Sequence, residues 1–265
     1  MLEDIGRGGD LTTEALVEPS REATAQIVAR SSGVIAGVSV AVLAFRLLEE
    51  RINAAILIGD GERVEAGGVV AEIAGSARAI LTAERSALNF LSHLSGIATA
   101  TRALVDLVAG TRAKIADTRK TTPGLRALER YAVACGGGTN HRFGLDDGVL
   151  IKDNHLALAG SIRAAVAAAR ARAGHMVKVE VEVDTLEQLE EALAEPVDAV
   201  LLDNMDPAML AEAVRVVDGR VLVEASGGVN ESNVLAIARA GVDVISVGRL
   251  THSAPSLDLS LEVSS

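Results

Sequence analysis

Six short apolar runs recur in the second half of the chain, and each is followed by polar residues and then by a helical pattern. The runs cover residues 114–117, 149–153, 177–183, 199–203, 221–225 and 242–247. Segments between them, such as 162–172, 186–193 and 234–240, carry apolar residues at helical spacing. Strands that alternate with helices predict parallel βα units, and therefore an α/β domain.

The strand predicted at 178–183 discriminates between two α/β architectures. Period-two geometry places Lys178, Glu180 and Glu182 on one face of this strand and the valines on the other. A central strand of an open, doubly wound sheet has helices on both faces and should be apolar on both. A polar row is typical of the inside of a barrel, and six units are fewer than the usual eight, so we expect an incomplete barrel.

The first part of the chain follows a different pattern. A half-buried strand is predicted at 24–30, a helix at 38–50, and short strands around Ile56 and at 69–73, with glycine turns between them. This indicates an α+β layer with a mostly antiparallel sheet. A long helix then runs to Gly110 with Thr82 as its predicted N-cap. Arg85 falls in the first turn of this helix, where a solvated surface arginine is as good an interpretation as a functional one.

Composition narrows the class of protein. The 265 residues carry a net charge of −11, one cysteine and four aromatic residues. Acidity and so few aromatic side chains argue against a nucleic-acid partner. No apolar run approaches the length of a membrane span, and the acidic start has no apolar stretch typical of an export signal, so we expect a cytoplasmic protein without a membrane partner. The single Cys135 also suits a reducing compartment.

Basic residues are concentrated between positions 117 and 155. Arg119, Lys120, His141, Arg142 and Lys152 lie there in short turns beside predicted strand ends. In an acidic chain this indicates a focused anion site. A glycine-rich segment at 136–142, predicted to be a flexible loop, ends in the His-Arg pair, and the cluster is typical of a clamp for a dicarboxylate.

Other predicted strand ends carry polar and glycine residues. Ser226, Gly227 and Gly228 follow one strand and Gly248 follows the next, which predicts a phosphate pocket between the last two βα loops. A tight turn is the alternative. Two acidic residues, Glu182 and Asp203, end neighbouring strands and would suit Mg²⁺, with an ion pair to Lys152 or Lys178 as the alternative. The combination favours a phosphoribosyl transfer or a sugar-phosphate lyase.

These motifs resemble those of the quinolinate phosphoribosyltransferase family. The resemblance extends over nearly the whole chain, and its most specific part is GGGTNHR…LIKDNH. The matching segments are 3–6, 10–13, 84–97, 117–126, 136–155, 179–184, 201–204, 224–228 and 246–258.

The resemblance implies a fold, an assembly and a reaction. The fold would be α/β, with an N-terminal open α+β sandwich domain at 1–91, joined by the C-terminal tail 254–265, and an incomplete, seven-stranded α/β barrel at 92–253. The protein would be a homodimer with shared active sites. With Mg²⁺, it would convert quinolinate and phosphoribosyl pyrophosphate into nicotinate mononucleotide, pyrophosphate and CO₂ in NAD biosynthesis.

The resemblance also implies roles for individual residues. Arg119, His141, Arg142 and Lys152 would hold the quinolinate carboxylates, and Arg85 would reach in from the partner subunit. Lys120, Glu182 and Asp203 would act on the pyrophosphate, ribose and Mg²⁺, and Lys152 is also a catalytic candidate. The phosphate pocket would be formed by Ser226, Gly227, Gly248 and His252.

Three other interpretations remain open at this point. A related barrel protein linked to molybdenum transport would share much of the pattern but use another acceptor. A Schiff-base aldolase would use Lys152 or Lys178 and would need that lysine to be desolvated. The third is a ligand-binding barrel without catalysis.

Overall fold

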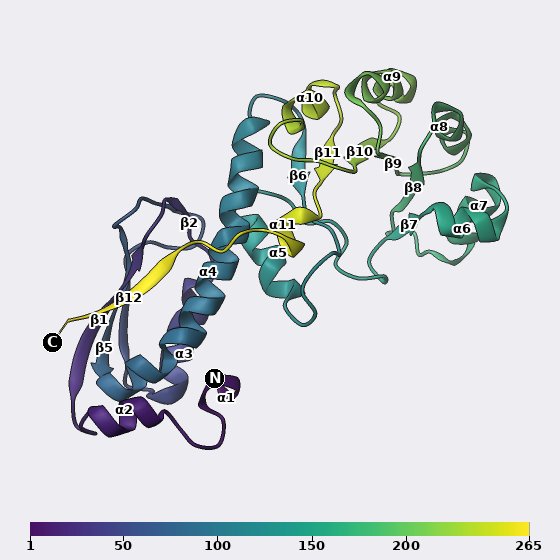
Figure 1. The fold of residues 1–265 in the computed structure, drawn as a ribbon. Coiled ribbons are helices and arrows are strands. Elements are labelled where there is room, and N and C mark those ends of the chain that lie inside the picture. Colours follow the sequence, from purple (N-terminus) through teal and green to yellow (C-terminus); the bar gives the residue numbers. More distant parts are fainter. Residues whose placement is uncertain (265) are drawn as a thin grey trace. The chain divides into compact units, whose positions relative to one another are not determined.

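The computed structural model describes residues 1–264, which fold into two compact units (Figure 1). The first unit contains residues 1–102, 122–137 and the segment from 253 onward, and the second contains 103–121 and 138–252. None of the helices in the described residues is long and apolar enough to cross a membrane.

A four-stranded antiparallel sheet forms the centre of the first unit, in the order β12-β1-β5-β3. Its strands are β1 (Glu22–Ala29), β3 (Asn53–Ile56), β5 (Val69–Ser76) and β12 (Leu259–Ser264). The expected antiparallel layer is therefore present, and the last strand of the chain pairs with the first. A separate pair is formed by β2 (Gly33–Val34) and β4 (Arg63–Val64).

Helices complete the core of the first unit. They are α1 (Leu2–Ile5), α2 (Leu11–Leu16), α3 (Val38–Leu48), α4 (Ala77–Leu107) and α5 (Arg126–Cys135). Fully buried Phe45 of α3 and Leu91 of α4 pack in one cluster with Ile27 and Ile73 of the sheet. Burying each such side chain stabilises the fold by about 1.5–3 kcal/mol.

The long helix α4 begins five residues before the predicted N-cap, so the assignment of Thr82 was wrong. Strand β5 ends at Ser76 and the helix follows directly, with the Ala79 N–H donating to the Ser76 Oγ at 3.4 Å. The guanidinium of Arg78, in the added turn, donates to two carbonyls of the segment around α2. Ser76 therefore acts as a local N-cap, and the contacts of Arg78 with carbonyls distant in sequence further stabilise the first turn, so Arg85 lies well inside the helix.

The second unit contains a parallel sheet in the order β6-β11-β10-β9-β8-β7, with a strand at each of the six predicted positions. The strands are β6 (Lys114–Ala116), β7 (Val149–Ile151), β8 (Val179–Val183), β9 (Ala199–Asp203), β10 (Leu222–Ser226) and β11 (Val244–Ser246). A single parallel bridge between Ala116 and Thr139 adds a seventh position. The incomplete α/β barrel is confirmed, with its seventh strand reduced to one residue.

Most helices that follow the barrel strands lie on the outside of the curved sheet (Figure 1). They are α6 (Asp153–Ala159), α7 (Ile162–Arg172), α8 (Leu186–Leu193), α9 (Pro207–Val217) and α10 (Val234–Arg239). The short helix α11 (Arg249–His252) follows β11 and lies at the end of that strand (Figure 1). Helix α5 follows β6 in sequence but belongs to the first unit. There Gly136, just after α5, packs so tightly on α4 that a Cβ would lie 2.6 Å from the Cβ of Thr101. The glycine-rich segment is therefore a packing contact at its start and not the flexible loop expected.

The two compact units are divided at other positions than the domain boundary expected between residues 91 and 92. That position lies inside the unbroken helix α4, most of which belongs to the first unit. The segment 122–137 also belongs to the first unit, although it interrupts the barrel in sequence. Helical hydrogen bonds continue across 91 and 92, so the chain has no flexible joint there.

Gly96 allows the C-terminal segment to cross α4 at close range. A Cβ at this position would collide with the carbonyl oxygen of Pro255 and lie 2.9 Å from the Cα of Ser256. Both are backbone atoms and cannot rotate away. Overpacking costs about 1–3 kcal/mol, whereas alanine gains about 1 kcal/mol over glycine in a helix, so the collision should dominate.

We therefore predict that Gly96→Ala lowers the free energy of unfolding by about 1–2 kcal/mol. The thermal midpoint should fall by roughly 2–4 °C per kcal/mol for a chain of this size. Gly174→Ala is the control, because no atom lies within 4 Å of a Cβ built there. A Gly96→Ala protein as stable as the wild type would contradict this account of the crossing.

Candidate active site

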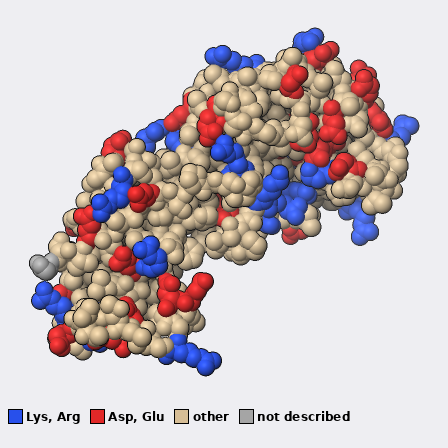
Figure 2. Space-filling model, in the orientation of Figure 1, with Lys and Arg blue, Asp and Glu red and all other residues tan. Residues whose placement is uncertain are grey.

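Two adjoining cavities lie at the carboxyl ends of the barrel strands, and both are lined only by residues of the second unit. The first has a volume of about 510 Å³ and the second about 330 Å³. Lys120 and Ser226 line both of them. Lys and Arg side chains gather at one place on this unit (Figure 2), although the chain as a whole is acidic.

Glycines shape the first cavity. Gly227 and Gly228 have φ of +98° and +60°, and a Cβ on Gly227 would collide with the side chain of Asn204. A Cβ on Gly248 would lie 2.9 Å from the Cδ of Lys120, so glycine leaves room for the lysine side chain. A glycine backbone that a ligand can approach closely, next to a lysine side chain, is typical of a phosphate-binding pocket.

The second cavity is lined by the cationic side chains of Arg119, Lys120, Arg142 and Lys152. The Arg142 guanidinium donates to the Gly148 carbonyl at 2.9 Å, which fixes its direction. Burial and, after it, the neighbouring Arg119 lower the pKa of Arg142. A bound anion would relieve this repulsion, and two guanidinium groups suit carboxylates in particular.

The polar row of β8 faces the barrel interior, as predicted, and its residues have different partners. Lys178, before the strand, pairs with Asp198 at 2.9 Å and has an 80% exposed side chain. Glu182, at the other end, forms an ion pair with Lys152. Between them Glu180 is buried. Because Lys178 is exposed and both lysines are ion-paired, neither is the desolvated amine that a Schiff-base aldolase requires.

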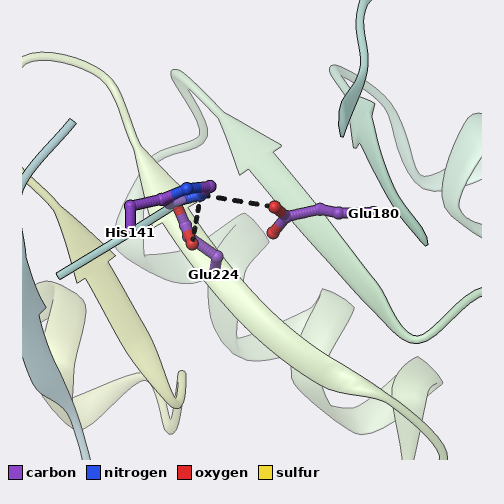
Figure 3. A group of neighbouring side chains, drawn as sticks. All are labelled: His141, Glu180 and Glu224. Carbon is purple, nitrogen blue, oxygen red and sulfur yellow. Dashed lines mark ion pairs between the residues drawn. The ribbon is translucent and has the colours of Figure 1, made fainter. Parts of the chain in front are cut away.

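His141 lies between two buried carboxylates (Figure 3). Its Nε2 is 3.4 Å from an oxygen of Glu180 on β8 and 3.4 Å from an oxygen of Glu224 on β10. Hydrogen bonding to Glu180 and then to Glu224 raises the pKa of His141 to about 10. The backbone N–H of Arg142 donates to Nδ1 at 2.7 Å. Both ring nitrogens of His141 therefore have protein partners, which differs from the expected role of holding a substrate carboxylate.

Asp117, directly after β6, positions the loop that carries these residues. Its carboxylate is fully buried and accepts from the Asn140 side chain at 2.6 Å and the His141 N–H at 2.8 Å. Hydrogen bonds from N–H groups to a buried carboxylate are among the stronger ones in proteins. The loop is therefore fixed where it meets the barrel.

Comparison with known proteins identifies this arrangement. Residues 10–95 match the N-terminal domain of the quinolinate phosphoribosyl transferase family, and residues 97–262 match its C-terminal domain. The chain belongs to the quinolinate phosphoribosyl transferase family.

Individual relatives agree with this assignment over at least 90% of their own length. A probable nicotinate-nucleotide pyrophosphorylase (carboxylating) of Bacillus subtilis is 48% identical, covering 99% of this chain and 90% of its own. The nicotinate-nucleotide pyrophosphorylase (carboxylating) of Mycobacterium leprae is also 48% identical, with coverage of 98% and 93%. The structure of the Francisella tularensis nicotinate-nucleotide pyrophosphorylase superimposes with a TM-score of 0.95 at 41% identity, covering 99% of this chain and 92% of that one.

The quinolinate phosphoribosyl transferase fold brings most of the predicted site residues together. The first cavity contains Lys120, Asp203, Ser226, Gly227, Gly248 and His252. The second contains Arg119, Lys120, His141, Arg142, Lys152 and Ser226. Glu182 meets Lys152 at the same barrel end. Arg85 lies on α4 in the first unit, where its side chain is exposed.

Sequence reasoning assigned no function to Glu180, Glu224 or Asp117. A signal was present for the two glutamates. Glu180 lies in the polar row of β8, and Glu224 lies two residues before Ser226, so both alternate with predicted site residues on the same face of their strands. Their contact with His141 depends on the order of the strands, which periodicity does not reveal.

Proposed function

We propose that this member of the family transfers a phosphoribosyl group from phosphoribosyl pyrophosphate to quinolinate. The products would be nicotinate mononucleotide, pyrophosphate and CO₂, in the biosynthesis of NAD. The observation that carries the proposal is the pair of adjoining cavities. One is lined by glycines and Lys120, and the other by two arginines, Lys152 and the shared Lys120. The relatives' names agree with a carboxylating pyrophosphorylase and not with the molybdenum-linked alternative.

The chemistry divides between the two cavities. Lys120, Ser226, Gly227, Gly248 and His252 would bind the phosphate groups of phosphoribosyl pyrophosphate in the first. Arg119, Arg142 and Lys152 would bind the two carboxylates of quinolinate in the second. The pyridine nitrogen would then attack the anomeric carbon as pyrophosphate leaves, through an oxocarbenium-like state. The pyridinium that forms withdraws electrons from the ring, so the carboxylate beside the nitrogen can leave as CO₂.

Mg²⁺ is the proposed metal, and Asp203 is the residue that fits it best. Asp203 lines the phosphate cavity and accepts a hydrogen bond from the Asn204 side chain at 2.7 Å. Mg²⁺ is usually held by one or two carboxylates together with substrate phosphates. Glu182 is engaged by Lys152, which favours the ion pair considered as its alternative role. When bound, Mg²⁺ would neutralise the negative charge of the leaving pyrophosphate.

A homodimer with shared sites and a cytoplasmic location complete the proposal. Arg85, exposed on α4, would complete the quinolinate pocket of the partner subunit. This role rests on the family resemblance. A single cysteine in 265 residues suits the reducing cytoplasm.

Purified protein with quinolinate, phosphoribosyl pyrophosphate and Mg²⁺ should release CO₂. If no CO₂ is released, the proposed function is refuted.

The first prediction about individual site residues distinguishes the roles of the two cavities. Arg142→Ala should weaken quinolinate binding by about 10-fold or more, since losing a charged hydrogen-bond partner costs about 1.5–3 kcal/mol. Calorimetry should find phosphoribosyl pyrophosphate binding unchanged. Arg172→Ala, an exposed arginine of α7, is the control. Equal loss of both affinities would contradict the division.

A second prediction concerns the metal. Asp203→Asn should raise the Mg²⁺ concentration needed for half-maximal rate, because the amide lacks the charge that attracts the ion. Glu182→Gln should lower the rate through Lys152 but leave the Mg²⁺ requirement where it was. Asp218→Asn, at an exposed helix end, controls for the substitution. If Glu182→Gln shifts the Mg²⁺ requirement as much as Asp203→Asn, both residues are ligands.

The third prediction tests the shared site. Arg85→Ala and Lys152→Ala should each be inactive alone. After free subunit exchange, half the dimers are heterodimers with one intact site, so activity should return to about a quarter of wild type. Arg119→Ala mixed with Lys152→Ala should recover nothing, since both residues belong to one subunit's site. No recovery with Arg85→Ala, with exchange verified by mass spectrometry, would mean that Arg85 does not act across the dimer.

A further inference from the structure

A third cavity, the lower cavity, lies inside the barrel. The cluster of His141, Glu180 and Glu224 separates it from the two upper cavities described above. The lower cavity has a volume of about 420 Å³ and is lined by residues from the amino-terminal ends of the strands, including Ala199, Leu222 and Val244. It is also lined by Glu180 and by Glu224 and His141, and the latter two line the proposed quinolinate pocket as well. The interior of a complete eight-stranded barrel is packed with side chains. In this incomplete barrel, His141 and Glu224 instead separate two cavities.

Strand periodicity explains why Glu224 reaches both cavities. Leu222, Glu224 and Ser226 are alternate residues of β10 and therefore face the same side of the sheet. Leu222 lines the lower cavity and Ser226 lines the two upper cavities. Glu224 lies between Leu222 and Ser226. Glu224 is 3% exposed, and its Oε1 has no hydrogen-bond partner among the described residues. A buried carboxyl oxygen without a partner is costly unless it carries or meets a proton.

The hydrogen bonds of His141 determine where protons lie in this cluster. Nδ1 accepts the Arg142 N–H, so its lone pair is used and the ring proton must be on Nε2. This N–H points to both glutamates (Figure 3). The same tautomer excludes a metal ion on Nε2, because a metal needs the lone pair that the proton occupies.

The Nε2–H of His141 and the nearby guanidinium of Arg142 face two buried carboxylates, whose mutual repulsion favours a further proton held between them. Hydrogen bonds to Glu180 and then Glu224 raise the pKa of His141, so the three groups share protons and titrate together. Burial, more than any other cause, also raises the pKa of Glu180. With Nδ1 already occupied, the retained proton is on a carboxyl oxygen.

We propose that Glu224 delivers the proton that replaces CO₂ on the pyridine ring and regains it from water through the lower cavity. This inference rests on the proposed function. Loss of CO₂ leaves an electron pair on the ring carbon, and nicotinate mononucleotide carries hydrogen at that position. Of the two acids around His141, only Glu224 lines the quinolinate pocket.

The step balances without any further reactant. The bond between ring carbon C2 and its carboxylate breaks, and CO₂ leaves without the bonding electrons. As this bond breaks, the electron pair that develops on C2 takes the proton of the Glu224 carboxyl group in the same step, and Glu224 becomes a carboxylate. Water that enters the lower cavity returns a proton to Glu224 before the next turnover. His141, held by Arg142 and Asp117, keeps its N–H directed at the carboxyl group and acts as a positioning residue.

The test compares pyrophosphate and CO₂ release in a single turnover of the full-length protein. Wild type should release them in equal amounts. Glu224→Gln, which has the same shape but no acidic proton, should release pyrophosphate while CO₂ release slows by about 100-fold or more, the usual contribution of a general acid. The ribosylated, still dicarboxylated pyridine should then accumulate and be detectable by chromatography after quenching.

Controls distinguish proton delivery from structural damage. Glu224→Asp keeps an acid one methylene further back and should restore CO₂ release in part. Glu212→Gln, an exposed glutamate of α9, should keep the two products equal. Circular dichroism checks folding. If Glu224→Gln does not fold, Glu224→Asp carries the same comparison, because retracting the acid should delay CO₂ relative to pyrophosphate.

A second variant tests the route by which the proton returns. Ala199→Leu adds a larger side chain to the lower cavity without touching the upper one. It should leave the single turnover unchanged and slow continuous turnover. An unchanged continuous rate would overturn the route through the lower cavity.

The outcomes separate this inference from the proposed function. If wild type releases neither product from quinolinate and phosphoribosyl pyrophosphate, the proposed function fails. If wild type is active and Glu224→Gln slows both products equally, or neither, Glu224 is not the proton donor.

Discussion

The buried carboxylate of Asp117 is the contact on which the arrangement of the site depends. It lies at the end of β6 and accepts hydrogen bonds from Asn140 and His141, which follow the excursion of the chain through α5. The excursion belongs to the other unit, so the returning chain has to be attached to the barrel again. This attachment places Thr139 beside β6 as the seventh barrel position and directs His141 and Arg142 into the interior.

Charge compensation inside the barrel follows from this attachment. The structure gives each of three charged residues a different neighbour: Asp198 for the exposed Lys178 before β8, His141 for the buried Glu180, and Lys152 for Glu182 at the end of β8. Isolated buried charges would cost several kcal/mol each. The partners of these charges reduce this cost. Arg119, Arg142 and Lys152 line the upper cavity, and the acids that contact His141 lie beneath them.

Much of the fold was predictable because its signals are local. Each barrel strand is a short apolar run ended by polar or glycine residues, and each run forms a strand in the structure. Glycines at 227 and 248 marked the first cavity because a Cβ at either position would collide with a neighbouring side chain. The start of α4 depends only in part on local signals, since Arg78 in its first turn donates to carbonyls more than 60 residues away. The position of α5 depends likewise on Gly136 packing against Thr101.

The sequence by itself determined the fold class, the end of the barrel that carries the chemistry and the cations that line it. Strand periodicity and loop composition are properties of neighbouring residues, so they can be recognised before the chain is folded. Only the tertiary structure decided which charges meet: Glu182 with Lys152, and His141 with Glu180 and Glu224. These partners come from different strands and loops, and their distances depend on strand order and on where the loop after α5 is attached. Periodicity determines the face on which a side chain lies, whereas the assembled barrel determines its neighbours.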